Sequence, residues 1–168
     1  VGIIRDSKVE ILADEFGNNI IPSTVSYNED GEVIGVGVND GLQISSIKRL
    51  MGKSFSDLES KNFPFKIIDE KGLRIVIGSR KIRPEEVAAE ILKYLKNIAE
   101  KNLNIQIKKA VITVPAYFDE AAKNATKLAA NLANLEVIRL VNEPTAAALA
   151  YGLENSSEGL YCVYDLGG

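Results

Sequence analysis

Lys108–Ala130 reads KKAVITVPAYFDEAAKNATKLAA, and this stretch decides the fold class. It opens with Ala110–Val114, a largely apolar run of the kind that forms a strand buried on both faces of a sheet. Pro115 ends the run, and the alanine-rich stretch Asp119–Ala133 that follows has the composition and spacing of a helix. A buried strand that leads directly into a helix is typical of a layered α/β core.

The alternation of strand and helix continues toward the C-terminus. Val137–Val141 predicts a second buried strand, Pro144–Leu153 a helix and Leu160–Tyr164 a third strand. Because strands joined by helices are usually parallel neighbours, we expect a parallel sheet here. Cys162 lies in the last of these strands, where a small buried residue is expected rather than a reactive thiol.

The segments before this stretch have a different character. Pro84–Leu103 is the longest helical signal, because a proline and two glutamates suit its N-terminus and its apolar residues recur at helical spacing. Two short helices are also expected, Gln43–Met51, which Gly52 would close, and Ser54–Glu59. The rest predicts antiparallel strands, namely Val1–Ile4 with Val9–Ala13, Thr24–Tyr27 with Val33–Val38, and Phe65–Ile68 with Leu73–Ile77.

Composition narrows the possible functions. The chain has 168 residues, 46% of them hydrophobic, which is enough for one domain with a sizeable core or with an insertion. A net charge of −3 gives no basic excess for nucleic acid, and no apolar run is long enough to span a membrane. Because the sequence has one cysteine and no histidine, any catalysis must rely on carboxylates, lysine, hydroxyls, backbone amides or a hard metal. A single cysteine also fits a reducing cytoplasmic compartment.

Polar residues gather where the predicted parallel strands end, which is where α/β sheets bind ligands. Each has a plain structural interpretation: Pro115 can simply end a strand, Glu143 can stabilise a helix start by about 0.3–1 kcal/mol, and Asp165 can begin an ordinary turn. Together they hold the parts that phosphoryl transfer requires. A carboxylate beside glycines can hold hydrated Mg²⁺, a second carboxylate can orient or deprotonate water, and a lysine can balance charge on a phosphoryl group.

Four stretches resemble the nucleotide-binding domain of the seventy-kilodalton heat-shock chaperones, DnaK and its relatives. They are SSIKRLMGKSF (Ser45–Phe55), KKAVITVPAYFDEAAKNATKLAA (Lys108–Ala130), VIRLVNEPTAAALAYGLE (Val137–Glu154) and VYDLGG (Val163–Gly168). The likeness runs over essentially the whole chain. The tail GLENSSEGLYCVYDLGG and the stretch ISSIKRLMGKS are most similar to the HscA branch of the family, which serves iron–sulfur cluster assembly.

The resemblance implies an actin-like, ribonuclease-H-like ATPase fold of two lobes, with ATP or ADP and Mg²⁺ between them. By this alignment residues 1–25 and 109–155 form the core of lobe I, and residues 26–108 form an inserted α+β subdomain. Residues 156–168 match the first strand and part of a phosphate loop of lobe II. The rest of lobe II, and the strand and first phosphate loop with which the family begins, have no match in this sequence.

The resemblance also assigns site residues. Lys48 matches the catalytic lysine that contacts phosphate and the attacking water, and Arg49 stands beside it as a second nucleotide contact. Glu143 matches a catalytic carboxylate that positions water and, through water, the metal. Asp165 matches a catalytic aspartate near the metal, and the glycines of its phosphate loop are Gly167 and Gly168.

Pro115 matches a switch proline that relays nucleotide state to the substrate domain. The arginine that usually accompanies this proline is Lys123 here. Lysine keeps the charge but lacks the planar fork of arginine, so the relay geometry is expected to differ.

Three functions follow from these observations. The first is a fragment of a chaperone ATPase, inactive alone, whose intact form works with a J-domain cochaperone and a client peptide or an iron–sulfur scaffold. The second is a non-catalytic module that binds a cochaperone or exchange factor, and the third is a small kinase of the same superfold. We also expect Leu160–Gly168, which resembles the unmatched first strand, to fill an open sheet edge, within one chain or by exchange between two copies in a strand-swapped oligomer.

Overall fold

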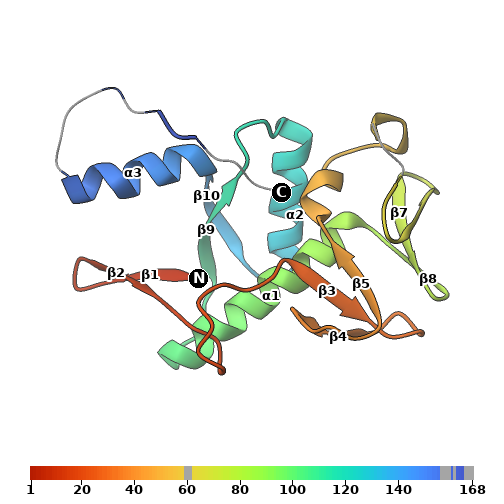
Figure 1. Cartoon of the computed structure of the whole chain (residues 1–168), viewed down its shortest axis with the longest axis horizontal. Helices are drawn as coiled ribbons and strands as arrows, with labels where there is room; N and C mark the ends of the chain where they lie inside the picture. Colours follow the sequence, from red (N-terminus) through yellow and green to blue (C-terminus); the bar gives the residue numbers. More distant parts are fainter. Residues whose placement is uncertain (59–61, 156–159, 161, 165–168) are drawn as a thin grey trace.

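The computed structural model describes residues 1–58, 62–155, 160 and 162–164, and these form a mixed α/β structure (Figure 1). Small antiparallel sheets make up the first half of the chain, as predicted. A hairpin comes first, and a three-stranded sheet follows in which β3 lies between β4 and β5. The strands are β1 (Gly2–Arg5), β2 (Lys8–Ile11), β3 (Thr24–Tyr27), β4 (Val33–Val36) and β5 (Leu42–Ser45).

A second three-stranded sheet follows, consisting of β6 (Lys66–Asp69), β7 (Leu73–Ile77) and β8 (Arg80–Ile82), with β7 in the centre. Its first two strands confirm the predicted hairpin, whereas the short, mostly polar β8 has no apolar alternation from which to predict it. Alternate residues of β7 are buried and pack with Val25 and Ile44 in one cluster. This period of two is how a strand turns one face to the core.

The predicted helix over Gln43–Met51 is wrong. Its first part belongs to β5, where Ile44 pairs with Val25 of β3 and is fully buried. Ser46 then takes a left-handed conformation with φ 55°, and a short 3₁₀ helix, η1 (Ile47–Leu50), follows. The apolar spacing of three suits this outcome as well, because a 3₁₀ helix repeats every three residues.

The second short helix, predicted at Ser54–Glu59, is a single 3₁₀ turn, η2 (Phe55–Asp57). The backbone N–H and the hydroxyl of Ser54 donate to Asp57 Oδ2 at 2.9 Å and 2.5 Å. These hydrogen bonds hold the pKa of the Asp57 carboxyl below its usual value. The serine and aspartate therefore cap a turn rather than start a longer helix.

α1 (Pro84–Leu103) has the bounds that its sequence predicts, and the second half of the chain is built on it. Strand β9 (Lys109–Val114) leads through α2 (Glu120–Leu132) to β10 (Glu136–Asn142), and α3 (Glu143–Asn155) follows directly. The parallel pairing of β9 with β10 confirms the expected parallel neighbours. Among the described residues, no helix has both the length and the apolar character needed to cross a membrane.

The expectation that β9 is buried on both faces is wrong. Ala110 and Ile112 pack toward Leu92 of α1 and the C-terminal end of α2, but Val111, which points the other way, is 56% exposed. The helices described here cover one face of the β9–β10 pair, so alternate side chains of the apolar run remain at the surface.

The predicted strand at Leu160–Tyr164 is also wrong within this chain, because residues 160 and 162–164 belong to no strand. Cys162 is exposed, contrary to the expectation of a buried residue. For these described residues, the structure contradicts insertion of Leu160–Gly168 into an open sheet edge of the same chain. No described element covers their apolar side chains.

Candidate functional site

η1 presents two cations to the surface. Ile47 and Leu50, three residues apart, are buried on one side of this turn, and Lys48 and Arg49 between them are exposed. The turn is short, and neighbouring elements fix its position. Met51 directly after it is buried with Phe118 and residues of α2, so the base of the turn is fastened to the second half of the chain.

Glu143 stands at the junction where β10 ends and α3 begins. A carboxylate at this position faces the positive end of a helix dipole, which stabilises its charge. Lys48 Nζ donates to Glu143 Oε1 at 2.7 Å, although the two residues are 95 positions apart in the chain. The fold therefore brings together two of the residues that the sequence selects as catalytic.

This ion pair is accessible. The side chains of Lys48 and Glu143 are 52% and 30% exposed. Exposed ion pairs contribute about 0–1 kcal/mol to stability, so this pair stabilises the fold only weakly. An ammonium group next to a carboxylate can instead bind an anionic oxygen and orient a water molecule.

An apolar groove of about 340 Å³ opens beside Lys48. One rim is the C-terminal end of β9 with Pro115, which is buried, and the other is Ser23 with η1. The floor consists of apolar residues of α1 and α2. Pro115, the predicted switch residue, therefore lines the same groove as Lys48.

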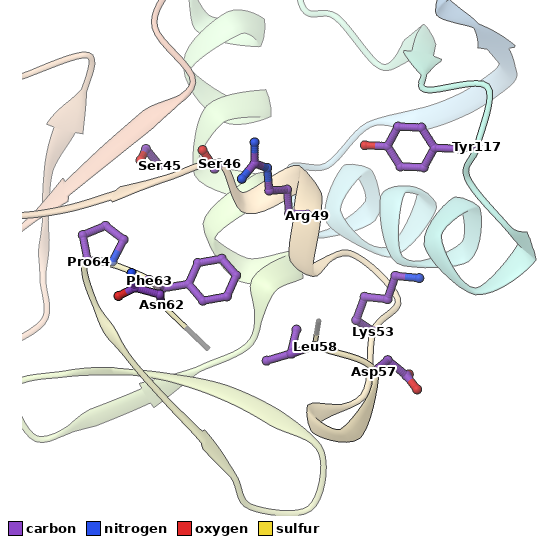
Figure 2. Close-up of a pocket in the computed structure, with 10 residues that line it drawn as sticks. All are labelled: Ser45, Ser46, Arg49, Lys53, Asp57, Leu58, Asn62, Phe63, Pro64 and Tyr117. Atoms are coloured by element: carbon purple, nitrogen blue, oxygen red, sulfur yellow. The ribbon is translucent and has the colours of Figure 1, made fainter. Parts of the chain in front are cut away.

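Arg49 does not share that groove. It lies on the rim of a separate pocket of about 480 Å³, with Lys53 and Tyr117 (Figure 2). The phenol of Tyr117 extends toward the side on which Arg49 lies, and its side chain is well exposed. The sequence analysis does not select Tyr117, and the only signal there was an aromatic residue two positions after the strand-ending Pro115.

Lys123 lies apart from Pro115, in a groove of about 690 Å³ that also contains Lys127 and Arg139. Its Nζ donates to Glu120 Oε1, one turn back along α2, at 3.0 Å. Among the described residues, no hydrogen bond joins Lys123 to Pro115, and the two predicted relay residues line different grooves.

The remaining predicted site residues, Asp165, Gly167 and Gly168, lie outside the described residues. Within the described ranges, no three residues of the types His, Cys, Asp and Glu are grouped so that they could hold a metal ion. Of the two carboxylates predicted to lie near Mg²⁺, Glu143 is the one that the structure describes, and its Oε1 accepts a hydrogen bond from Lys48.

Comparisons with known proteins show the family of this chain. The model of the family described as "Hsp70 protein" matches residues 1–168, and the chain belongs to the Hsp70 family. Within that family it is 47% identical to a protein of Polynucleobacter asymbioticus and 48% identical to one of Cupriavidus pinatubonensis, each named "Chaperone protein HscA homolog". Both matches cover all of this chain but only 28% of the relative, so the chain spans little more than a quarter of their length.

Proposed function

We propose that this chain forms part of the ATPase domain of a chaperone, in which Lys48 and Glu143 act on the phosphate end of ATP. The 2.7 Å contact between Lys48 Nζ and Glu143 Oε1 carries the proposal, because it joins the two predicted catalytic residues at one accessible point. In the intact protein the fold is the two-lobed, actin-like ATPase fold, and ATP is bound in the cleft between the lobes.

Each residue has its own role in this proposal. Lys48 binds a γ-phosphate oxygen and the attacking water, which places positive charge where negative charge develops. Glu143, released from Lys48, accepts a hydrogen bond from that water and aligns it. Mg²⁺, when bound, supplies neutralising charge to the phosphates, and Glu143 and Asp165 are the residues proposed to hold it.

The other assignments belong to the same proposal. Residues 1–25 and 109–155 form the core of lobe I, residues 26–108 the inserted subdomain, and residues 156–168 the beginning of lobe II. Arg49, Gly167 and Gly168 complete the contacts with ATP or ADP, and Pro115 with Lys123 relays the nucleotide state between domains. We place the intact protein in the cytoplasm, with a J-domain cochaperone and a client peptide or iron–sulfur scaffold as partners, as the HscA names of its relatives suggest.

A chimera tests the chemistry. The matching segment of the Polynucleobacter asymbioticus relative, 47% identical over the whole chain, is replaced by residues 1–168. We expect the chimera to hydrolyse ATP and Lys48→Ala to lower single-turnover hydrolysis by about 10²–10³-fold, as for the loss of one electrostatic donor to a transition state. Lys81→Ala is the matched control, because Lys81 on β8 is 46% exposed, against 52% for Lys48, and is likewise paired with a carboxylate, Glu70.

Equal turnover in the Lys48→Ala and Lys81→Ala chimeras would contradict the assignment of Lys48. The 168-residue chain alone gives a second test. Hydrolysis requires preorganised groups on all sides of the phosphates, so we expect its ATP turnover to equal the uncatalysed background. Turnover by this chain that disappears with Lys48→Ala would show that it does not need the second lobe.

A second candidate is a non-catalytic module that binds an acidic partner. The groove with Lys123, Lys127 and Arg139 favours it, because in the described part of the chain neither Lys127 nor Arg139 forms an ion pair. We expect a cochaperone or exchange factor with an acidic surface to bind the chain in a calorimetric titration, and Arg139→Glu to abolish the heat signal. Lys8→Glu, which changes charge on the distant β1–β2 hairpin, is the control.

A further inference from the structure

A groove of about 490 Å³ is lined by the loop after β2, by β4 with the residues that follow it, and by Tyr94 of α1. Ile21 of the loop packs against both the cluster around Val25 and the cluster around Ile98, so the core fixes this part of the lining. Among the described residues, none lines both this groove and the groove beside Lys48. The two are separate features of the surface.

The lining of this groove exposes large apolar side chains. Phe16 and Ile20 on the loop are 79% and 87% exposed, and Ile34 on β4 and Val38 after it are partly exposed. Apolar side chains that gather in this way around a groove are typical of a surface that binds another molecule. Exposed aromatic residues are also common among the side chains that dominate the affinity of protein interfaces.

The loop that carries Phe16 has a defined conformation. Asp14 Oδ1 accepts hydrogen bonds from the backbone N–H groups of Phe16 and Asn18 at 2.9 Å and 2.8 Å. Asn102 of α1 donates from its Nδ2 to the carbonyl oxygen of Ala13 at 3.0 Å, which joins the loop to the helix. Because these contacts already place the aromatic ring, a partner does not have to order the loop when it binds.

The segment that supplies most of the lining is acidic. Between Lys8 and Lys48 the chain has seven acidic residues and no lysine or arginine. Two of the acidic residues, Asp14 and Glu15, line the groove itself. Glu15 pairs with Lys101 at 3.3 Å, but both side chains are exposed, so the pair is weak and a cation from another molecule can replace Lys101. The charge therefore favours a partner that is basic as well as apolar.

We propose that this groove binds a segment of a partner protein that carries large apolar side chains next to lysine or arginine. The apolar side chains of the segment pack against Phe16, Ile20 and Ile34, and one of its cations binds Glu15 in place of Lys101. A second copy of this chain does not have the matching charge, because its net charge is −3.

This interaction is independent of the ATPase chemistry. None of the residues that line the groove is assigned to phosphate or Mg²⁺. Substitutions in the groove should therefore leave the ATP turnover of the chimera unchanged. Conversely, a chimera that fails to hydrolyse ATP would leave the binding of a basic segment unaffected.

The first experiment measures fluorescence anisotropy with two labelled amphipathic peptides and the 168-residue chain. One peptide consists of leucine and lysine, and the other has the same leucine positions with glutamate in place of lysine. We expect the lysine peptide to bind, and the glutamate peptide to bind at least about tenfold more weakly, since like charges repel. Equal affinity for the two peptides, or no binding of the lysine peptide, overturns the proposal.

Paired substitutions locate the apolar contact. Phe16→Ser combined with Ile20→Ser should raise the Kd of the lysine peptide by roughly 30-fold or more, as for the loss of dominant interface side chains. Ile4→Ser combined with Val9→Ser is the matched control, because these residues of the β1–β2 hairpin are 78% and 74% exposed. Circular dichroism checks that both variants are folded. Equal weakening by the two pairs of substitutions contradicts binding in this groove.

A charge variant tests the proposed cation contact. Glu15→Gln should weaken binding of the lysine peptide by roughly two- to fivefold, the contribution of one exposed ion pair. Glu10→Gln is the control, because Glu10 forms a similar exposed pair with Arg5 at 3.4 Å on the hairpin. The same affinity in both variants overturns the assignment of Glu15.

Methyl NMR on the wild-type chain locates the peptide without any substitution. The lysine peptide carries a nitroxide spin label, which broadens the signals of nearby isoleucine methyl groups. We expect the strongest broadening at Ile20 and Ile34, and little at Ile4 or Ile138, which are exposed on other strands. Broadening that is strongest at Ile4 or Ile138, or equal at all four, overturns the proposal. So does a dimer of the wild-type chain, seen by light scattering, that Phe16→Ser with Ile20→Ser abolishes, because the occupant would then be a second copy.

Discussion

Replacing Gly52 by alanine is expected to loosen the attachment of η1 to α2. Gly52 follows η1 and has a φ of +69°, a conformation that L-residues other than glycine adopt at a cost. A Cβ at this position would lie 2.4 Å from the backbone nitrogen of Ala122 and 2.5 Å from the carbonyl carbon of Ala121. The backbone after Lys48 thus touches the first turn of α2, with no room for a methyl group.

The loss of unfolding free energy expected for Gly52→Ala has two contributions. The left-handed conformation costs about 1–2 kcal/mol for an L-residue. Moving one backbone segment away from the other costs a further 1–3 kcal/mol or so, as in overpacked cores. Gly17→Ala measures the cost of the backbone conformation alone, because Gly17 has a similar φ of +83° and a Cβ there would meet nothing within 4 Å. We therefore expect a loss of unfolding free energy of about 2–5 kcal/mol for Gly52→Ala and about 1–2 kcal/mol for Gly17→Ala.

Urea denaturation of the two variants and the wild type measures both losses. If the two substitutions destabilise the chain equally, within about 0.5 kcal/mol, the close approach of Gly52 to α2 plays no part, and the reasoning is refuted. ATP turnover should also be affected more by Gly52→Ala than by Gly17→Ala. In the chimera, Gly52→Ala shifts η1 and is expected to lower ATP turnover, whereas Gly17→Ala leaves it unchanged.

Three further outcomes test the core, a buried phenol and a helix cap. Ile44→Ala is expected to cost about 2–5 kcal/mol in urea denaturation, and exposed Ile4→Ala under 0.5 kcal/mol or so. Burial raises the pKa of Tyr27, so above about pH 10 the phenol ionises in the unfolded chain but stays neutral in the folded one. The free energy of unfolding should therefore fall above about pH 10, by up to about 1.4 kcal/mol per pH unit. Tyr27→Phe should remove this loss when unfolding is measured at pH 9 and pH 11. Asp119 Oδ1 accepts a hydrogen bond from the backbone N–H of Ala122 at 2.8 Å, so Asp119→Ala should cost about 0.5–2 kcal/mol and Asp119→Asn much less by the same measurement.

The sequence predicted those elements whose cause is local. α1 has its predicted bounds because proline, glutamates and apolar spacing act within one segment. The helix predicted at Gln43–Met51 fails because pairing of Ile44 with Val25 decides the conformation there, and that partner lies outside any local window. The burial expected for β9 and Cys162 fails for a related reason, since an apolar run shows what can be buried but not which element covers it.

The candidate site likewise depends on contacts between residues that are distant in the sequence. Lys48 and Glu143 were selected by resemblance, and no local pattern could show that residues 95 positions apart meet at 2.7 Å. Arg49, adjacent to Lys48, was expected to share its ligand, but successive residues of a tight turn point in different directions, and Arg49 lines another pocket. Tyr117 on that pocket was missed because an exposed aromatic residue has no signature of its own in a sequence.

Because the Lys48–Glu143 pair is accessible to solvent, the effects of Lys48→Ala on ATP turnover and on stability can be told apart. For Lys48 to reach a phosphate oxygen the pair must open, and an exposed pair of this kind resists opening by only about 0–1 kcal/mol. The contact therefore does not block the site, and it holds both groups within one hydrogen bond of each other before a ligand arrives. Glu143 left alone by Lys48→Ala remains solvated, so no buried charge destabilises the fold. A large loss of ATP turnover in that variant, with its unfolding free energy within about 1 kcal/mol of the wild type, would consequently report on phosphate chemistry and not on folding.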